Sequence, residues 1–328
     1  MRSARTRLPG HPDKVCDLVV ESIVDEYLRR DPESRLCINA IGGRGAIFVC
    51  GDVNSTADFD VTAIVRQALG RAGVIQEFEP FIAIEQVAPE QKEQMAQGPA
   101  ESVTVVGYAT KDTVDLLPRP VSLSRVIAKR LHDLRTSDEA WFWLGADGEV
   151  TVHEEGDEIY VRLLVEHGNH DLSLARNKLT EVVRALAPEA RIKINPLGPN
   201  EVRGLHNMSG ASGKDVLPYG PMLPAVRGGI GYDLRHPEKS GAWLARAAAR
   251  KLVARGAKSA MVQLVFEAGD SFPSHVRARD EKGNDLSSQL NKDELSIKRV
   301  LSDWQRPGLS SEAALWGFAG QPGLPWED

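Results

Sequence analysis

The chain has 328 residues, of which 42% are hydrophobic and 26% charged, and its formal net charge is −6. This composition is ordinary for a globular protein, and the length is sufficient for two or three domains. The negative charge argues against a nucleic-acid-binding surface, and no apolar stretch approaches the roughly 20 residues that span a bilayer. The three cysteines (Cys16, Cys37 and Cys50) suit reduced thiols, so we expect a cytoplasmic protein with no nucleic-acid or membrane partner.

The first predicted helix covers residues 12–30, where apolar residues recur at three- and four-residue spacing. It begins inside the string GHPDKVCD at residues 10–17, and Pro12 fits the first helical turn. Helix N-termini attract anions. Asp13 is therefore a candidate Mg²⁺ ligand, Lys14 a phosphate-binding cation and His11 a hydrogen-bond donor. A capped helix with a surface lysine is the simpler interpretation, but the complete string favours the phosphate site.

Strands and helices alternate along the rest of the chain. The pattern predicts strands at 35–41, 46–53, 80–86, 103–108, 149–152, 158–166 and 260–267, and helices at 61–72, 122–135, 173–186 and 242–254. Residues 90–97 read as a polar loop, and residues 194–241 as a long loop rich in glycine and proline. The tail, 309–328, is expected to pack on another part of the fold or on a neighbour. The order indicates α+β domains.

Several motifs in order resemble those of the methionine adenosyltransferases, also called S-adenosylmethionine synthetases. They begin with GHPDKVCD and continue through Gly51-Asp52-Val53, Gln86, GYA at 107–109, LPRP at 117–120, INPLG at 194–198 and GASGK at 210–214. The resemblance covers roughly residues 8–270. The first motif is highly specific, whereas the later ones gain weight from their order.

The resemblance implies an α+β fold of three similar sheet-plus-helix domains around a pseudo-threefold axis, with an interleaved chain. The implied central domain takes residues 10–92 with 209–241, the N-terminal-type domain 1–9 with 120–208, and the C-terminal-type domain 98–119 with 242–328. It also implies a homodimer with active sites at the subunit interface.

The implied reaction is attack of methionine sulfur on C5′ of ATP, giving S-adenosylmethionine, phosphate and pyrophosphate. By position, the resemblance implies catalytic roles for His11, Lys14, Lys214 and His236, and substrate binding by Asp52, Gln86, Glu101, Ser212, Arg227, Tyr232 and Lys239. Asp13 and Glu238 are the implied Mg²⁺ ligands. K⁺ is doubtful, because Ile38 stands where the family's glutamate would hold it.

The chain also departs from the family pattern. Gly145 stands in place of an aspartate, Asn200 in place of an aromatic residue, and Asp147, Asp215, Tyr232 and His236 in place of lysines. Arg203, Arg227, Arg235 and Lys239 are candidates to restore positive charge. Two alternatives to the plain activity follow: a specialised relative with an altered nucleotide or sulfur substrate, and a non-catalytic homologue that acts as a partner or regulatory subunit.

Overall fold

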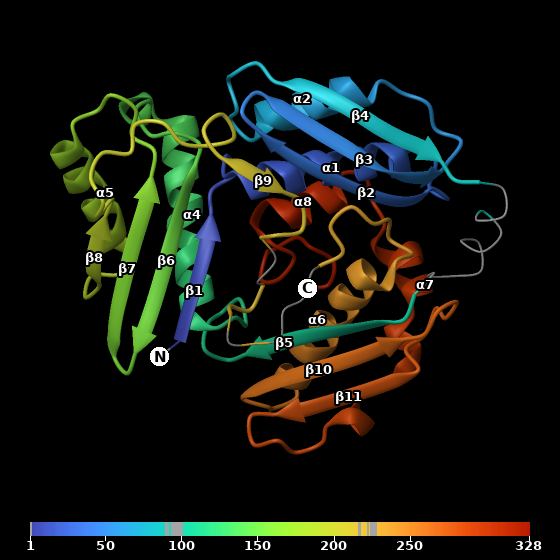
Figure 1. Ribbon diagram of the computed structural model, residues 1–328. Coiled ribbons are helices and arrows are strands. Elements are labelled where there is room, and N and C mark those ends of the chain that lie inside the picture. The colour runs from blue at the N-terminus through green and yellow to red at the C-terminus, as the bar shows by residue number, and fades with distance from the viewer. Residues whose placement is uncertain (1, 89–91, 93–100, 216–217, 222, 224–227) are drawn as a thin grey trace.

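A computed structural model of the chain describes residues 2–88, 92, 101–215, 218–221, 223 and 228–328. The architecture consists of three sheets, each with helices packed on it (Figure 1). No helix in these ranges is both long and apolar enough to cross a membrane.

The first sheet has the strand order β1-β6-β7-β8. Its strands are β1 (Arg2–Arg7), β6 (Gly148–Glu155), β7 (Glu158–Val165) and β8 (Arg191–Ile194). Helices α4 (Arg119–Ser137) and α5 (Leu172–Leu186) lie beside it, and Glu139–Trp141 forms a short 3-10 turn after α4. The apolar residues of this sheet and its helices form a separate core.

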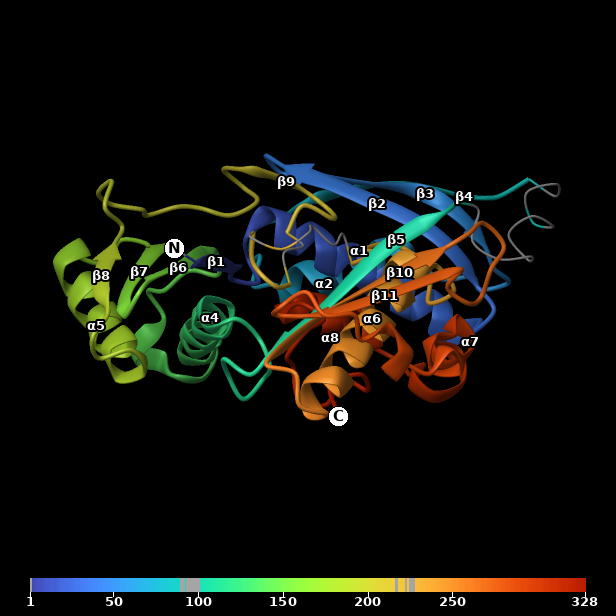
Figure 2. The same ribbon diagram turned by 90° about the horizontal axis from the view of Figure 1, so that it is seen from below.

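The second sheet has the order β4-β3-β2-β9. Its strands are β2 (Arg35–Gly43), β3 (Ala46–Asn54), β4 (Glu79–Gln86) and β9 (Ser209–Ala211). Helices α1 (Pro12–Arg30) and α2 (Val61–Arg71) lie under this sheet, as Figure 2 shows.

The third sheet has the order β11-β10-β5. Its strands are β5 (Val103–Thr110), β10 (Ser259–Phe266) and β11 (His275–Asp280), and α6 (Pro237–Ala254) packs against β5 and β10. Short turns at Ser287–Gln289, Lys292–Leu295, α7 (Ile297–Arg299) and Val300–Trp304 lead to α8 (Leu309–Trp316).

The sheets share a topology. In each, a helix precedes an antiparallel strand pair (α1 before β2–β3, α4 before β6–β7, α6 before β10–β11), and one distant segment pairs antiparallel with the first strand. The two four-stranded sheets then add a second helix and a parallel strand. The α+β prediction is confirmed. The predicted division into three domains around a pseudo-threefold axis stays a prediction, although each sheet does combine distant segments.

The C-terminal tail packs inside the same chain. Helix α8 contacts α1, and the Asp25 carboxylate of α1 accepts the backbone N–H groups of Ser310 and Ser311, each at 2.9 Å. Trp326 is 1% exposed and stacks on Trp243 of α6 with ring centroids 4.0 Å apart. The tail therefore joins α1 to α6 in a core that extends over the second and third sheets.

Most predicted elements are present, with shifted ends. Helix α6 begins at Pro237 rather than at residue 242, because His236 caps it and Pro237 occupies the first turn. Four strands at sheet edges were not predicted: β1 and β11, whose sequences are polar and charged, and the short β8 and β9. Strand β9 lies inside the predicted loop at 194–241, where three residues are too few to give an apolar alternation. The predicted loop at 90–97 falls outside the described part of the chain except for Lys92.

Candidate functional site

His11 caps the N-terminus of α1. Its Nδ1 accepts a hydrogen bond from the Asp13 backbone N–H at 3.3 Å, so the ring proton of the neutral form lies on Nε2. Burial lowers the pKa of His11 to about 3, and the positive charges of Arg7, Arg203, Arg5 and Lys14 act in the same direction. His11 is therefore a neutral N–H donor at physiological pH, at a helix end surrounded by cations.

Asp13 is fully engaged by the protein. Its Oδ2 lies 2.6 Å from Arg7 Nη1, and its Oδ1 accepts the Ala211 backbone N–H at 3.0 Å. Arg7 also reaches Asp215 at 3.2 Å. The predicted metal ligand thus forms part of an ion-pair network that holds β1, α1 and the loop after β9 together.

Lys14 belongs to the same network. Its side chain is 6% exposed, and its Nζ donates to the Ala314 carbonyl at 3.0 Å and lies 3.3 Å from Asp215 Oδ2. The ammonium is directed toward α8, so in this arrangement its contribution to anion binding is limited to its electrostatic field.

One face of α1 carries a carboxylate every four residues: Asp13, Asp17, Glu21 and Asp25. Each accepts backbone N–H groups from a distant segment: Ala211 for Asp13, Gly213 for Asp17 at 2.7 Å, Gly231 for Glu21 at 2.6 Å, and Ser310 and Ser311 for Asp25. This acid ladder fixes the described parts of the glycine-rich loop and the start of α8 on α1. The four-residue spacing was visible in the sequence, but its partners were not.

The N-terminus of α6 repeats the cap of α1. His236 Nδ1 accepts the Glu238 backbone N–H at 3.2 Å, and burial lowers the pKa of His236 to about 4, with Lys239 acting in the same direction. The ring stacks on Tyr232 with centroids 3.8 Å apart and an interplanar angle of 8°. The backbone of Tyr232 forms an isolated antiparallel β-bridge with Cys37 of β2.

The structure brings four of the predicted residues into one cluster. His236 Nε2 lies 3.9 Å from Glu101 Oε1, and Tyr232 pairs with Cys37, which lies opposite Asp52 in the β2–β3 register. Burial raises the pKa of Tyr232 to about 12, so its hydroxyl stays protonated. The cluster joins aromatic rings to two carboxylates at the surface.

Lys239, a predicted substrate-binding residue, has an internal partner. It is 1% exposed, and its Nζ lies 2.5 Å from Glu21 Oε2. The pair holds α6 on α1, and the ammonium is not presented to a ligand in this arrangement. The neighbouring candidate Arg235 pairs with Glu33 at 2.6 Å.

The remaining predicted residues are dispersed. Gln86 donates to the Ser55 carbonyl at 2.8 Å, and Ser212 Oγ accepts the Ala40 backbone N–H at 3.0 Å. Lys214 is exposed at the turn after β9. Arg227 lies outside the described residues.

The donors in this arrangement do not fit a resident Mg²⁺ ion. Both Asp13 oxygens have protein partners, and Glu238 starts the other helix. Across the described ranges, no group of three or more His, Cys, Asp or Glu side chains is arranged to hold a metal. Mg²⁺ commonly binds through one or two carboxylates together with substrate phosphates, so we assign it no resident site.

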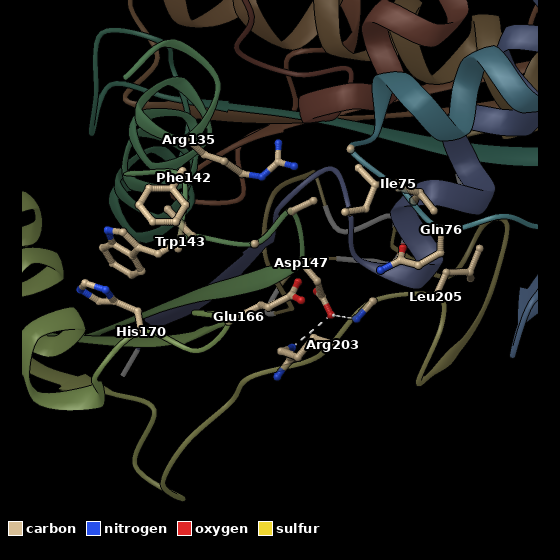
Figure 3. Close-up of a pocket in the computed structure, with 18 of the residues that line it drawn as sticks. Ile75, Gln76, Arg135, Phe142, Trp143, Asp147, Glu166, His170, Arg203 and Leu205 are labelled. Carbon is tan, nitrogen blue, oxygen red and sulfur yellow. Dashed lines mark hydrogen bonds and ion pairs between the residues drawn. The ribbon is translucent and has the colours of Figure 1, made fainter. Parts of the chain in front are cut away.

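A cavity of about 560 Å³ opens beside the N-terminus of α1, between the first and second sheets (Figure 3). Gly10 lines it, so it is adjacent to His11. Figure 3 shows Phe142, Trp143 and His170 on one side, and Ile75, Gln76 and Leu205 on the other. The polar groups Asp147, Glu166 and Arg203 lie between these two sides, with Arg135 above.

Sequence reasoning named Arg203 only as a candidate cation and did not identify Glu166. Trp143 is 6% exposed and also lines the cavity. No local motif marks these residues, since they come from the end of β7, the segment before β6 and the long loop. The nearest signal in the sequence was the departure of Gly145 and Asp147 from the family pattern.

The fold and site define an α+β protein with a cavity lined by aromatic rings, two carboxylates and two arginines. Sequence models of the S-adenosylmethionine synthetase N-terminal domain and central domain match residues 3–94 and 96–199, respectively. The chain belongs to the S-adenosylmethionine synthetase family.

Curated relatives match over nearly the full length. The S-adenosylmethionine synthase of Aquifex aeolicus is 27% identical over 364 aligned positions, covering 100% of this chain and 96% of the relative. That of Deinococcus radiodurans is 29% identical and that of Thermus thermophilus 28%, each covering 97% of this chain and over nine-tenths of the relative. The resemblance stated from the motifs is thereby confirmed.

Proposed function

We propose that the protein is an adenosyltransferase that forms S-adenosylmethionine from ATP and methionine and releases phosphate and pyrophosphate. The methionine sulfur supplies the electron pair for a new S–C5′ bond, while the C5′–O bond to triphosphate breaks. Water then cleaves the triphosphate. Family membership and the synthase relatives support this assignment.

The single observation that carries the proposal is the neutral His11 at a cation-rich helix end beside a cavity of about 560 Å³. A leaving triphosphate gains negative charge as the C5′–O bond breaks, and fixed N–H donors stabilise such charge most when solvent is excluded. His11 Nε2–H is such a donor. Arg7 and Arg203 supply positive potential at the same helix end.

The thioether of methionine is a neutral, weak nucleophile, so orientation is the main contribution that the protein makes to its attack. The cluster of Tyr232, His236, Glu101 and Asp52 suits this amino acid. A carboxylate can pair with the α-ammonium, and the aromatic rings can pack on the side chain. Mg²⁺ enters in this proposal with ATP, as part of the substrate complex.

We further propose that the protein acts as a cytoplasmic homodimer, with the active site at the subunit interface. The outer face of the second sheet carries a row of apolar side chains in register across three strands: Ile41 opposite Phe48, and Phe48 opposite Phe81. They are 56%, 44% and 53% exposed. A flat exposed apolar face of this kind is typical of a partner-binding surface, and a second copy offers a complementary one.

A specialised relative with a different nucleotide or sulfur substrate is the second candidate. The observation that favours it is that the Lys14 and Lys239 ammonium groups are engaged by Asp215 and Glu21. A polyphosphate then depends on arginines for charge neutralisation.

The test is to incubate the purified protein with ATP, methionine and Mg²⁺ and to measure products by mass spectrometry and phosphate release. S-adenosylmethionine, phosphate and pyrophosphate in equal amounts are expected. Product formation only with another nucleoside triphosphate or thioether would favour the specialised relative. No turnover with any nucleotide, alone or mixed with a catalytic homologue, would contradict both and indicate a non-catalytic partner subunit. Light scattering of the wild type and of Phe48→Asp tests the dimer.

A further inference from the structure

The cavity beside α1 contains two acidic groups and one arginine whose positions depend on one another. Glu166 directly follows β7, and its backbone N–H donates to the Asp147 carbonyl at 3.2 Å. Gly145 donates to the Glu166 carbonyl at 3.0 Å. The segment before β6 and the end of β7 therefore lie side by side at the cavity wall.

The Glu166 carboxylate fills the space that a side chain at position 145 would need. A Cβ atom built on Gly145 would lie 2.1 Å from Glu166 Oε2, well inside van der Waals contact. Glycine at position 145 is therefore what allows the longer Glu166 side chain to place its carboxylate at this wall. Burial raises the pKa of Glu166, while the Arg203 backbone N–H stabilises the carboxylate.

Arg203 is held by Asp147. Asp147 is 1% exposed, and its Oδ2 accepts hydrogen bonds from Arg203 Nε at 3.0 Å and from the Gly204 backbone N–H at 2.8 Å. Because only Nε is used, the two terminal amino groups of the guanidinium have no protein partner in the described part of the chain. The guanidinium is near enough to His11 to lower its pKa, so its charge acts at the helix end.

Asp147 also has an unused acceptor. Its Oδ1 is buried and lacks a hydrogen-bond partner among the described residues. A buried carboxylate oxygen without a donor is costly. Because Asp147 Oδ1 is buried, the carboxylate that a ligand hydroxyl can meet at this wall is that of Glu166.

We propose that this cavity binds the nucleoside half of the nucleotide, with Glu166 accepting hydrogen bonds from the ribose hydroxyls and Arg203 acting as the phosphate-binding cation. Phe142 and His170 supply flat surfaces for the base, and Trp143 supports His170 by stacking between it, at 4.5 Å, and Trp141, at 5.3 Å. The charge of Arg203 acts on His11, so it also acts at the start of α1. The inference rests on the proposed function only in taking the ligand to be a nucleotide.

Calorimetric binding to the full-length protein separates the two roles without turnover. The probes are adenosine, ATP, 2′,3′-dideoxy-ATP and inorganic tripolyphosphate, each with Mg²⁺ where it carries phosphate. For Glu166→Ala, ATP affinity should fall roughly 10- to 100-fold, the usual loss for a hydrogen bond to a charged group, whereas 2′,3′-dideoxy-ATP affinity should hardly change. Glu166→Gln keeps the side-chain shape and should lose less.

For Arg203→Ala, the affinities for ATP and tripolyphosphate should fall roughly tenfold or more, while adenosine affinity stays as in the wild type. The double variant D147K/R203A lacks the arginine but has a lysine at position 147. Its positive charge should recover part of the tripolyphosphate affinity. Glu158 and Arg191 form an exposed ion pair at 2.6 Å on the same sheet, so Glu158→Ala and Arg191→Ala are matched controls. Both should bind every probe as the wild type does.

The inference is overturned if Glu166→Ala weakens ATP and the dideoxynucleotide equally, if Arg203→Ala leaves tripolyphosphate binding unchanged, or if the wild type binds no probe. These results are independent of the activity test. Turnover to S-adenosylmethionine with unaltered binding by the variants would retain the proposed function and reject this inference. If the variants bind as expected but the protein forms no S-adenosylmethionine, this inference is retained and the proposed function is rejected.

Discussion

The N-termini of α1 and α6 have nearly the same sequence and different surroundings. His11-Pro12-Asp13-Lys14 starts α1, and His236-Pro237-Glu238-Lys239 starts α6. In both, the histidine caps the helix through Nδ1, proline occupies the first turn, and the lysine is buried and faces a carboxylate. The short sequence therefore determines the cap in both places.

The surroundings determine what each cap can bind. Burial lowers the pKa of His11, cations from β1 and the long loop add to this effect, and the cavity opens beside Gly10. At α6, His236 stacks on Tyr232 and faces Glu101 instead. We therefore propose that the end of α1 binds the polyphosphate and the end of α6 the α-ammonium of methionine. A motif thus predicts local structure better than it predicts the ligand.

The largest expected effect is a difference in the free energy of unfolding between variants of the two lysines, Lys239 and Lys14. Lys239→Met leaves Glu21 charged and fully buried, so the free energy of unfolding should fall by about 3–5 kcal/mol, the usual cost of breaking a buried pair. Lys14→Met should cost less, because Arg7 still neutralises Asp215. Urea unfolding followed by tryptophan fluorescence measures both values. Equal losses would contradict the comparison, and the double variant E21M/K239M should recover much of the lost stability.

The next effect separates the two histidines in catalysis. His11→Ala and His236→Ala remove the same cap, so their losses in unfolding free energy should match at about 1 kcal/mol. His11→Ala should in addition lower kcat about 10²- to 10³-fold, because it removes a donor to the leaving triphosphate. His236→Ala should mainly raise KM for methionine. Steady-state kinetics with both substrates varied would show this split, and a reversed pattern would exchange the two roles.

The two helix starts also show which features of the structure the sequence predicts and which it does not. The apolar periodicity of α1, its start at Pro12 and the β2–β3 pair depend on neighbouring residues and were predicted, whereas the capping role of His11 was not. Recognition of the second His-Pro-acid-Lys string would have moved the start of α6 to Pro237. The pairing of Asp147 with Arg203, and the approach of Glu166 to Gly145, depend on contacts over tens of residues. No local pattern contains that information.

The pH dependence of stability should report both caps. The pKa of each folded histidine lies below the ordinary 6.5, at about 3 for His11 and about 4 for His236, so the unfolded chain binds the proton first as pH falls. Each histidine therefore contributes stability that is present above pH 6.5 and lost between pH 6.5 and its folded pKa. The wild-type curve minus that of His11→Asn, or of His236→Asn, should slope by about 1.4 kcal/mol per pH unit between pH 4.5 and 6. A flat difference for either variant would show that its histidine is charged in the folded state.

The smallest expected effect separates two carboxylates of the acid ladder. Asp17 Oδ1 accepts the Gly213 N–H, whereas its buried Oδ2 has no hydrogen-bond partner among the described residues and lies 3.7 Å from Lys14 Nζ. Burial raises the pKa of Asp17 to about 7, although the Lys14 charge acts in the opposite direction. The folded state then holds a proton that the unfolded state releases, so the contribution of Asp17 to stability is present at low pH and lost as pH rises from about 4 to 7. Asp17→Asn keeps the Gly213 hydrogen bond and removes this loss, so its unfolding free energy should change by less than about 1 kcal/mol at pH 6 and should rise relative to the wild type by pH 8.

Glu21→Gln should instead lower the unfolding free energy, because it leaves the Lys239 ammonium without its charged partner. Denaturation of both variants at pH 6 and 8 tests the difference, and a large loss for Asp17→Asn at both pH values would show that Asp17 is charged and paired like Glu21.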